Sequence, residues 1–120
     1  MVLDMHGGPS WVDNKINAPI MVDAAKHEYY KNGFFYIQGH FSKFLPPDSV
    51  RIELTSDKNV DKFETVAFQR PDNGIVVIAA NYNDSPVSLR IEDIAGNITG
   101  NNGREVKPHS IQTYIYWDKY

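Results

Sequence analysis

Residues 32–49 read NGFFYIQGHFSKFLPPDS, and this stretch divides the chain into two unlike parts. Apolar side chains recur through it at helical spacing, which predicts an amphipathic helix from Asn32 to Leu45. Asn32 suits the N-cap, and Pro46 with Pro47 ends the helix. The expected apolar stripe comprises Tyr30, Phe34, Ile37, Phe41, Phe44 and Leu45. A stripe this apolar requires a large apolar partner, which the preceding residues do not supply.

Within this helix Gly39 is an unfavourable choice, because glycine costs about 1 kcal/mol relative to alanine in a helix interior. We therefore expect a neighbour packed closely against Gly39. Upstream of the helix, Met1–Leu3 is a short apolar stub that leads into the loop GGPSW at residues 7–11. Glycine reaches positive φ at little cost and proline fixes the next residue, so this loop follows an unusual backbone path. Pro19–Val22 reads as a short extended run.

The chain after residue 49 predicts β-structure throughout. Five runs alternate apolar and polar residues or are continuously apolar, as strands do. They are Val50–Thr55, Thr65–Arg70, Ile75–Ala79, Val87–Ile91 and Ile111–Trp117. Turn sequences lie between them, namely PDNG at 71–74 and NDSP at 83–86. Five strands at roughly ten-residue spacing indicate half or more of a β-sandwich. Both parts of the chain look incomplete on their own.

Composition narrows the class of protein. The 120 residues carry a net charge of −3, so no basic surface for nucleic acid or for an anionic membrane is expected. The absence of cysteine excludes disulfides and cysteine-based zinc sites. The longest apolar run, Ile75–Ala80, has the length of a strand and not of a membrane span. The first residues lack the features of a secretory signal, so a lysosomal or secreted protein would need one upstream.

Residue chemistry alone predicts no enzyme. Asp4 and Asp13 flank the GGP loop and could be imagined as a glycosidase pair, but loop aspartates more often make local turn hydrogen bonds. The four histidines lack metal-ligand spacing, so neither a metal nor a cofactor is predicted: they are His6, His27, His40 and His109. Asn97 begins the glycosylation acceptor sequence NIT. Asn83 begins a second one, NDS, which the following Pro86 makes poorer.

Four stretches resemble the glucosylceramidases of glycoside hydrolase family 30. Residues 7–14, GGPSWVDN, resemble the loop after the last barrel strand of that family. Residues 35–44, FYIQGHFSKF, resemble its final barrel helix, and PPDSVRI at 46–52 resembles the link to its β domain. Residues 110–114, SIQTY, resemble its closing strand. The likeness runs through the whole chain in order.

This resemblance implies the end of a (β/α)8 TIM barrel followed by an antiparallel β-sandwich. Residues 1–45 would hold the strand-eight loop and last helix, 46–49 a linker, and 50–120 the sandwich. Further sandwich strands would come from the N-terminal region of the enzyme. The two glutamates of this retaining family lie on earlier barrel strands, so the resemblance implies no catalytic residue in this chain.

For the sugar pocket, the resemblance implies that Asn14 hydrogen-bonds the glucose hydroxyls. Trp11 would support the pocket loop together with three neighbours, Gly7, Gly8 and Pro9. Two positions depart from the family pattern. Lys15 stands where relatives usually carry an aromatic residue, and His6 stands where an acidic residue is common. A lysine there could alter how the lipid part of the substrate is received.

The implied function is hydrolysis of glucosylceramide by a lysosomal, glycosylated parent enzyme. A saposin-type activator and an anionic lipid surface would assist it, and no cofactor is implied. This chain alone is expected to be inactive without the missing N-terminal part. Three alternatives stay open: a family 30 enzyme acting on β-1,6-glucan or xylan, a non-catalytic sugar-binding sandwich, and a truncated inactive product. The apolar helix and the strand stub argue against a binding module, which needs neither.

Overall fold

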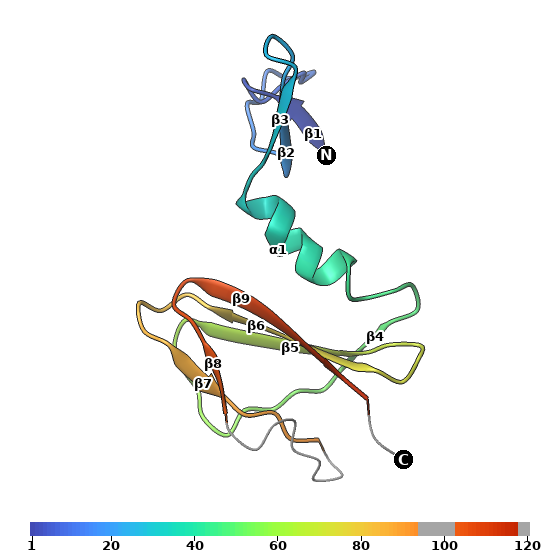
Figure 1. Ribbon diagram of the computed structural model, residues 1–120, viewed down its shortest axis with the longest axis vertical. Helices are drawn as coiled ribbons and strands as arrows, with labels where there is room; N and C mark the ends of the chain where they lie inside the picture. Colours follow the sequence, from blue (N-terminus) through green and yellow to red (C-terminus); the bar gives the residue numbers. More distant parts are fainter. Residues whose placement is uncertain (94–102, 118–120) are drawn as a thin grey trace. The chain divides into compact units, whose positions relative to one another are not determined.

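A computed structural model describes residues 1–93 and 103–117 of the chain. The chain forms two compact units, Met1–Ser42 and Lys43–Tyr120 (Figure 1). The first unit contains a small sheet and the one helix of the described residues, whereas the second is built from strands.

The first unit begins with a three-stranded sheet in the order β1-β2-β3. β1 (Val2–Asp4) pairs with β2 (Ile20–Asp23) in parallel, and β2 pairs with β3 (Glu28–Lys31) as an antiparallel hairpin. The apolar stub and the extended run are thus strands, as predicted. β3 was not predicted, because all four of its residues are exposed and its sequence lacks a buried face.

The helix α1 (Gly33–Ser42) follows β3 and begins at the predicted N-cap. The Asn32 side-chain oxygen accepts a hydrogen bond from the Phe34 amide at 3.0 Å, and the Asn32 side-chain amide donates to the Ala18 carbonyl. The helix ends at Ser42, so the predicted end at Leu45 is wrong by three residues. The physical reason is Pro46, whose ring would clash with the carbonyl four residues earlier if the helix continued.

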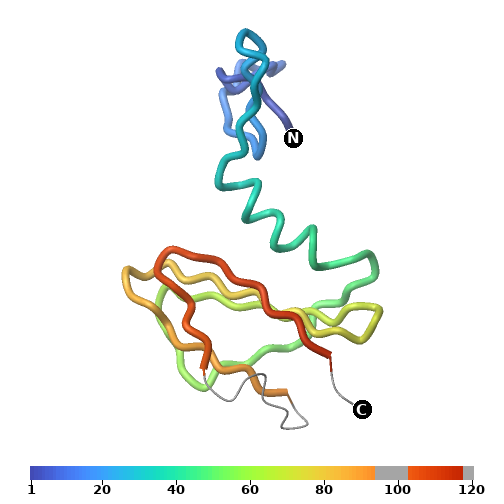
Figure 2. The backbone as a smooth tube through the Cα atoms, in the orientation of Figure 1, coloured from blue at the N-terminus to red at the C-terminus, as the bar shows by residue number. Residues whose placement is uncertain are grey.

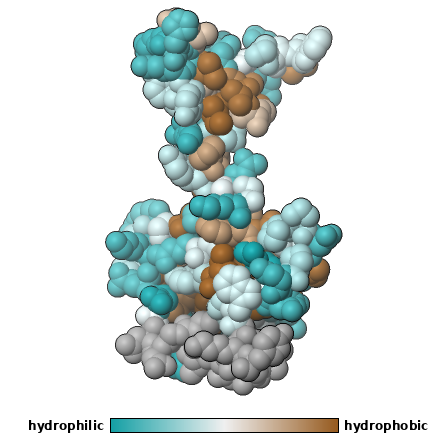
Figure 3. All heavy atoms as spheres, turned by 45° about the vertical axis from the view of Figure 1, so that its right-hand side comes forward, coloured by the Kyte–Doolittle hydropathy of each residue, from teal (hydrophilic) through white to brown (hydrophobic). Residues whose placement is uncertain are grey.

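The apolar side chains of α1 lie at the surface, and none of its residues is buried. Phe34 is 55% exposed and Ile37 is 49% exposed, and Figure 3 shows hydrophobic side chains on the surface of this unit. The expected close neighbour of Gly39 is also missing: apart from its chain neighbours and the backbone of its own helix, nothing in the described part of the chain lies within 4 Å of where a Cβ would stand. The helix therefore has its predicted apolar character, and Phe34, Tyr36 and Ile37 stay exposed on it.

The second unit contains a four-stranded antiparallel sheet in the order β4-β5-β6-β9. Its strands are β4 (Val50–Ile52), β5 (Phe63–Gln69), β6 (Ile75–Asn81) and β9 (Ser110–Tyr116). A second sheet pairs β7 (Val87–Leu89) with β8 (Arg104–Val106). Figure 2 shows that the chain forms β7 and β8 after β6 and then comes back, so that β9 lies alongside β6. The five predicted strands are all present, and β8 is the one strand among the described residues of this unit that was not predicted.

The β5–β6 turn forms where the sequence PDNG predicted it. The Arg70 amide donates to the Gly74 carbonyl at 2.8 Å, and the Asn73 amide donates to the Arg70 carbonyl at 3.0 Å. Asn73 has a φ of 62°, a left-handed conformation that asparagine tolerates well. The Asp72 carboxylate accepts from the Gly74 amide at 3.1 Å and closes the turn.

The core of the second unit lies between its two sheets. Ala67 of β5, Val77 of β6 and Ile91, which follows β7, form its buried centre. Half-buried side chains from both sheets pack around it: Ile52, Ile75, Leu89, Tyr114 and Tyr116. Two sheets that share one apolar core make a β-sandwich, which confirms this part of the predicted fold class. No helix within the described ranges is long and apolar enough to cross a membrane.

Candidate functional site

The loop that follows β1 is organised by the carboxylate of Asp4. Its Oδ1 accepts hydrogen bonds from the backbone amides of His6 and Gly8, each at 2.8 Å. The Asp4 amide donates to the Gly8 carbonyl at 2.8 Å, and the Gly7 amide donates to the Asp4 carbonyl at 3.1 Å. A turn at the end of β1 is thus closed by four hydrogen bonds.

These hydrogen bonds decide what Asp4 can do chemically. The Gly8 amide and then the His6 amide lower the pKa of Asp4 below its ordinary value of 3.8, because both donate to the charged form. An ionised carboxylate bound in this way is a poor proton donor, so Asp4 is unsuited to act as the acid of a glycosidase pair. For Asp4 the interpretation as a local turn residue is confirmed.

Gly7 occupies a position that no other residue fits. Its φ is +81°, and a Cβ there would stand 2.8 Å from the Ile16 carbonyl oxygen and 2.9 Å from the Ile16 nitrogen. Side chains rarely adopt this φ, and backbone atoms cannot yield as a flexible side chain can. The close approach of Gly7 to Ile16 brings the two ends of the loop together, as in a compact Ω-loop.

The far part of the loop is held by Ser10. The Ser10 hydroxyl oxygen accepts from the Asn14 amide at 3.1 Å and from the Val12 amide at 3.4 Å. Asp13 between them has a φ of 50°, and the Gly8–Pro9 peptide bond is cis. The backbone of Asn14 is therefore fixed by its own loop.

The side chain of Asn14 is exposed, and no hydrogen-bond partner for it exists within residues 1–93 and 103–117. A side-chain amide carries two donors and an acceptor, which suits recognition of neighbouring sugar hydroxyls. Asn14 thus presents an exposed side-chain amide on a backbone that its own loop fixes. Its role in binding glucose stays a prediction.

Trp11 stands at the exposed end of the same loop. Its side chain is 105% exposed and the next residue, Val12, is 81% exposed, so Trp11 packs on nothing in the described part of this chain. Gly7 and Gly8 shape the turn through the contacts given above, and Pro9 follows them on the loop surface. The role of Trp11 as a support of the pocket loop stays a prediction.

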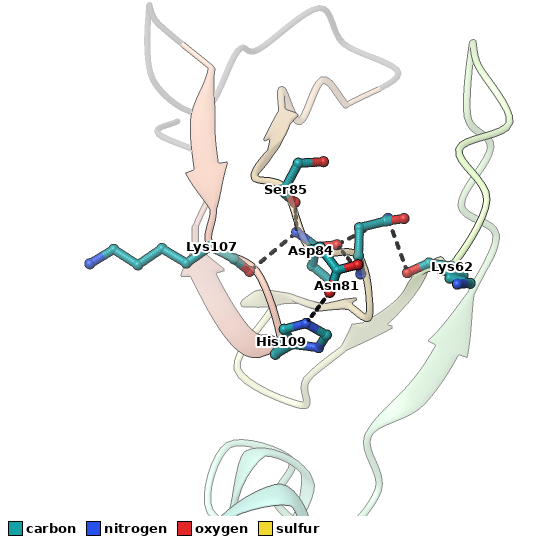
Figure 4. A network of polar contacts seen from close by, with 7 residues as sticks. Lys62, Asn81, Asp84, Ser85, Lys107 and His109 are labelled. Atoms are coloured by element: carbon teal, nitrogen blue, oxygen red, sulfur yellow. Dashed lines mark hydrogen bonds and ion pairs between the residues drawn. The ribbon is translucent and has the colours of Figure 1, made fainter.

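A second polar cluster, in the sandwich, was missed by the sequence analysis. Asn81 at the end of β6 is only 1% exposed, and its Nδ2 donates to the carbonyls of Ser85, Val106 and Lys107 at 2.9, 3.0 and 3.2 Å. Figure 4 shows the bonds to Ser85 and Lys107. A polar residue that closes the apolar run IVVIAAN is the one sequence feature that pointed to it. The neighbouring Asp84 binds His109 at 2.8 Å.

Neither cluster resembles a metal centre. Among the described residues, no three His, Asp or Glu side chains lie close enough together to hold a metal ion. The glycosylation candidate Asn97 lies outside the residues that the structure describes.

Comparison with protein families gives two matches that together cover most of the chain. Residues 1–45 match the glycosyl hydrolase family 30 TIM-barrel domain, and residues 48–114 match the glycosyl hydrolase family 30 beta sandwich domain. These matches confirm the predicted fold class, in which the end of a TIM barrel precedes a β-sandwich.

Individual relatives agree with this. The chain is 44% identical over 93 residues to the lysosomal acid glucosylceramidase of Mus musculus and 42% identical over 94 residues to putative glucosylceramidase 2 of Caenorhabditis elegans. Each alignment covers 78% of this chain but only 18% of the relative. The crystal structure of SrfJ from Salmonella typhimurium superposes with a TM-score of 0.87 at 24% identity, covering 98% of this chain and 25% of that one.

Proposed function

This chain belongs to glycosyl hydrolase family 30, and from that membership we propose that the enzyme containing it hydrolyses the β-glucosidic bond of glucosylceramide. The identity to glucosylceramidases of mouse and worm is the observation that carries the choice of substrate. Because the chain spans about a fifth of those relatives, the proposal concerns the whole enzyme and not this segment alone.

The proposed reaction is a double displacement with retention of configuration. One carboxylate attacks the anomeric carbon and forms a glucosyl-enzyme, while a second carboxyl group protonates the departing ceramide oxygen and then activates water. The two groups must lie about 5 Å apart on either side of the bond. We assign both to glutamates on earlier barrel strands, so this chain contributes no catalytic residue.

This chain would contribute one wall of the sugar pocket. Loops after barrel strands form the active-site face of a TIM barrel, and the Asp4–Ile16 loop directly follows β1, which we take as the eighth barrel strand. The fixed backbone and unengaged side chain of Asn14 support a role in binding the glucose hydroxyls. A preformed loop loses little conformational freedom when the sugar binds, which favours affinity.

The cellular setting is part of the same proposal. The mouse relative is named a lysosomal enzyme, and we place the parent of this chain in the lysosome, where a saposin-type activator and an anionic lipid surface would present the substrate.

The test uses the full-length enzyme, purified and assayed on three substrates. We expect release of glucose from glucosylceramide in mixed micelles, and little release of sugar from β-1,6-glucan or xylan. Turnover of either polysaccharide in preference to the glycolipid would overturn the choice of substrate while leaving the family intact. Inversion of the anomeric configuration in the released glucose would overturn the mechanism.

A further inference from the structure

Asn83 begins one of the two glycosylation acceptor sequences of this chain, but its side chain is already engaged. Its Nδ2 donates to the Asp61 carbonyl at 2.9 Å, to the Asn81 side-chain oxygen at 3.1 Å and to the Lys62 carbonyl at 3.4 Å. Its backbone amide donates to the same Asn81 oxygen at 3.0 Å. Asn83 therefore joins the β6–β7 turn to the segment that precedes β5.

Asn81, whose side-chain oxygen accepts two of these hydrogen bonds, cannot move to make room for a glycan. Asn81 is 1% exposed, and its own amide donates to three backbone carbonyls on the opposite side. Figure 4 shows the bonds to Ser85 and Lys107. Carbonyl oxygens only accept, so Nδ2 of Asn81 must face them and Oδ1 must face Asn83. The Tyr82 amide donates to the Lys62 carbonyl at 2.9 Å and holds the same segment against the turn.

Attachment of a glycan would act on the atom that makes these contacts. The new bond joins Nδ2 to the anomeric carbon of the first sugar, one Nδ2 hydrogen leaves as a proton, and the lipid diphosphate carrier departs with the bonding electrons. One hydrogen would then remain to serve three acceptors, and the sugar would stand where a protein oxygen now lies. A buried side-chain oxygen of Asn81 would lose a donor.

We infer that Asn83 is a structural clip whose contacts and an N-linked glycan exclude one another, so that the acceptor sequence at Asn83 carries no glycan in the folded protein. The clip at Asn83 rests only on the geometry of the second unit.

Two substitutions distinguish loss of the Asn83 side-chain contacts from loss of the acceptor sequence. Asn83→Gln and Ser85→Ala both destroy the acceptor triplet, but only Asn83→Gln removes the clip, because Ser85 accepts from Asn81 through its backbone carbonyl. In the full-length enzyme made in bacteria, we expect Asn83→Gln to lower the melting temperature by several degrees or to prevent folding. Ser85→Ala should melt within about a degree of the wild type. Equal melting temperatures for the two variants would overturn the clip.

Glycan occupancy is measured on the wild-type enzyme secreted from animal cells. The folded, protease-resistant fraction is treated with a glycan-releasing amidase in heavy-oxygen water, which labels each formerly glycosylated asparagine, and the peptides are weighed. We expect no label at Asn83. Label at Asn83 in that fraction would overturn the exclusion.

Discussion

Asp4 and Gly8 bind each other in both directions: the Asp4 carboxylate accepts from the Gly8 amide at 2.8 Å, and the Asp4 amide donates to the Gly8 carbonyl at 2.8 Å. This reciprocal pairing ties the first residues of the loop to the end of β1. The pairing therefore fixes the backbone conformation of the loop before any sugar binds to it. The geometry of the proposed pocket wall therefore depends on a side chain that would itself touch no substrate.

We expect Asp4→Ala in the full-length enzyme to impair the loop without unfolding the protein. Loss of both carboxylate hydrogen bonds would let the loop move, and misplacement of a positioning group by about 1 Å can cost up to a hundredfold in rate. The value of kcat/KM on glucosylceramide should therefore fall by about tenfold or more. The matched control is Asp57→Ala, which removes an exposed carboxylate of the second unit and should leave kcat/KM unchanged. Full activity of Asp4→Ala would contradict the role of this turn.

The same turn should be insensitive to pH except under strong acid. The Gly8 and His6 amides lower the pKa of Asp4 in the folded state, so its stabilising effect is present above the ordinary value of 3.8 and is lost as the pH falls through the lower folded value. The exchange protection of the Gly8 amide hydrogen should stay constant from about pH 7 to pH 5 and decline only below about pH 4. In Asp4→Asn this acid transition should disappear. A transition near neutral pH that depends on Asp4 would contradict the pKa direction.

Asn14→Ala should weaken the reaction through lost contacts to the sugar. Each hydrogen bond to a neutral group is worth about 0.5–1.5 kcal/mol, so two lost bonds predict a fall in kcat/KM between roughly fivefold and 160-fold. The melting temperature should not change, because the Asn14 side chain is exposed. Asn17→Ala, an exposed asparagine of the same segment, serves as the control and should behave like the wild type. Unchanged kinetics of Asn14→Ala would remove Asn14 from the site.

The 120-residue chain expressed alone should bind a hydrophobic dye or aggregate. The exposed apolar side chains of α1, among them Phe34 and Ile37, form a surface that a soluble monomer does not usually leave open. The same preparation should show no turnover of a fluorogenic β-glucoside, because the proposed catalytic glutamates lie outside it. Replacing Phe34 and Ile37 with Glu should reduce dye binding, whereas Glu at the exposed Val50 of β4 should not. A non-aggregating monomer without dye binding, or clear turnover, would contradict this prediction.

The sequence predicts the strands and the helix whose apolar pattern is strong. It does not predict β3 and β8, which have few buried side chains and are held mainly by backbone pairing with a neighbouring strand. β6 was predicted because it is apolar up to Ala80, and β9 because apolar residues recur along it, whereas β8 carries Val106 as its one buried side chain in three residues. The helix was predicted correctly at its start, where Asn32 caps it, and too long at its end, where the clash with Pro46 acts over four residues.

The candidate site was predictable only where its signal is local in the sequence. The resemblance supplied the loop and Asn14, and positive φ at Gly7 follows from the chemistry of glycine. The cluster around Asn81 could not be predicted, since its partners Val106 and Lys107 stand 25 and 26 residues away in sequence. Only the paired sheets bring those carbonyls to the end of β6.

Asn81→Leu is expected to be the most damaging single change in the sandwich. Leucine fills a similar volume but leaves the carbonyls of Val106 and Lys107 and the donors of Asn83 without their partner. Each unsatisfied buried group costs about 1–3 kcal/mol, so the free energy of unfolding should fall by about 3 kcal/mol or more. Urea unfolding of the full-length enzyme, followed through the sandwich transition, measures this loss. Asn59→Leu, on an exposed loop of the same unit, is the control and should change the midpoint little. A midpoint for Asn81→Leu equal to that of the control would show that Asn81 does not hold the β6–β7 and β8–β9 turns together.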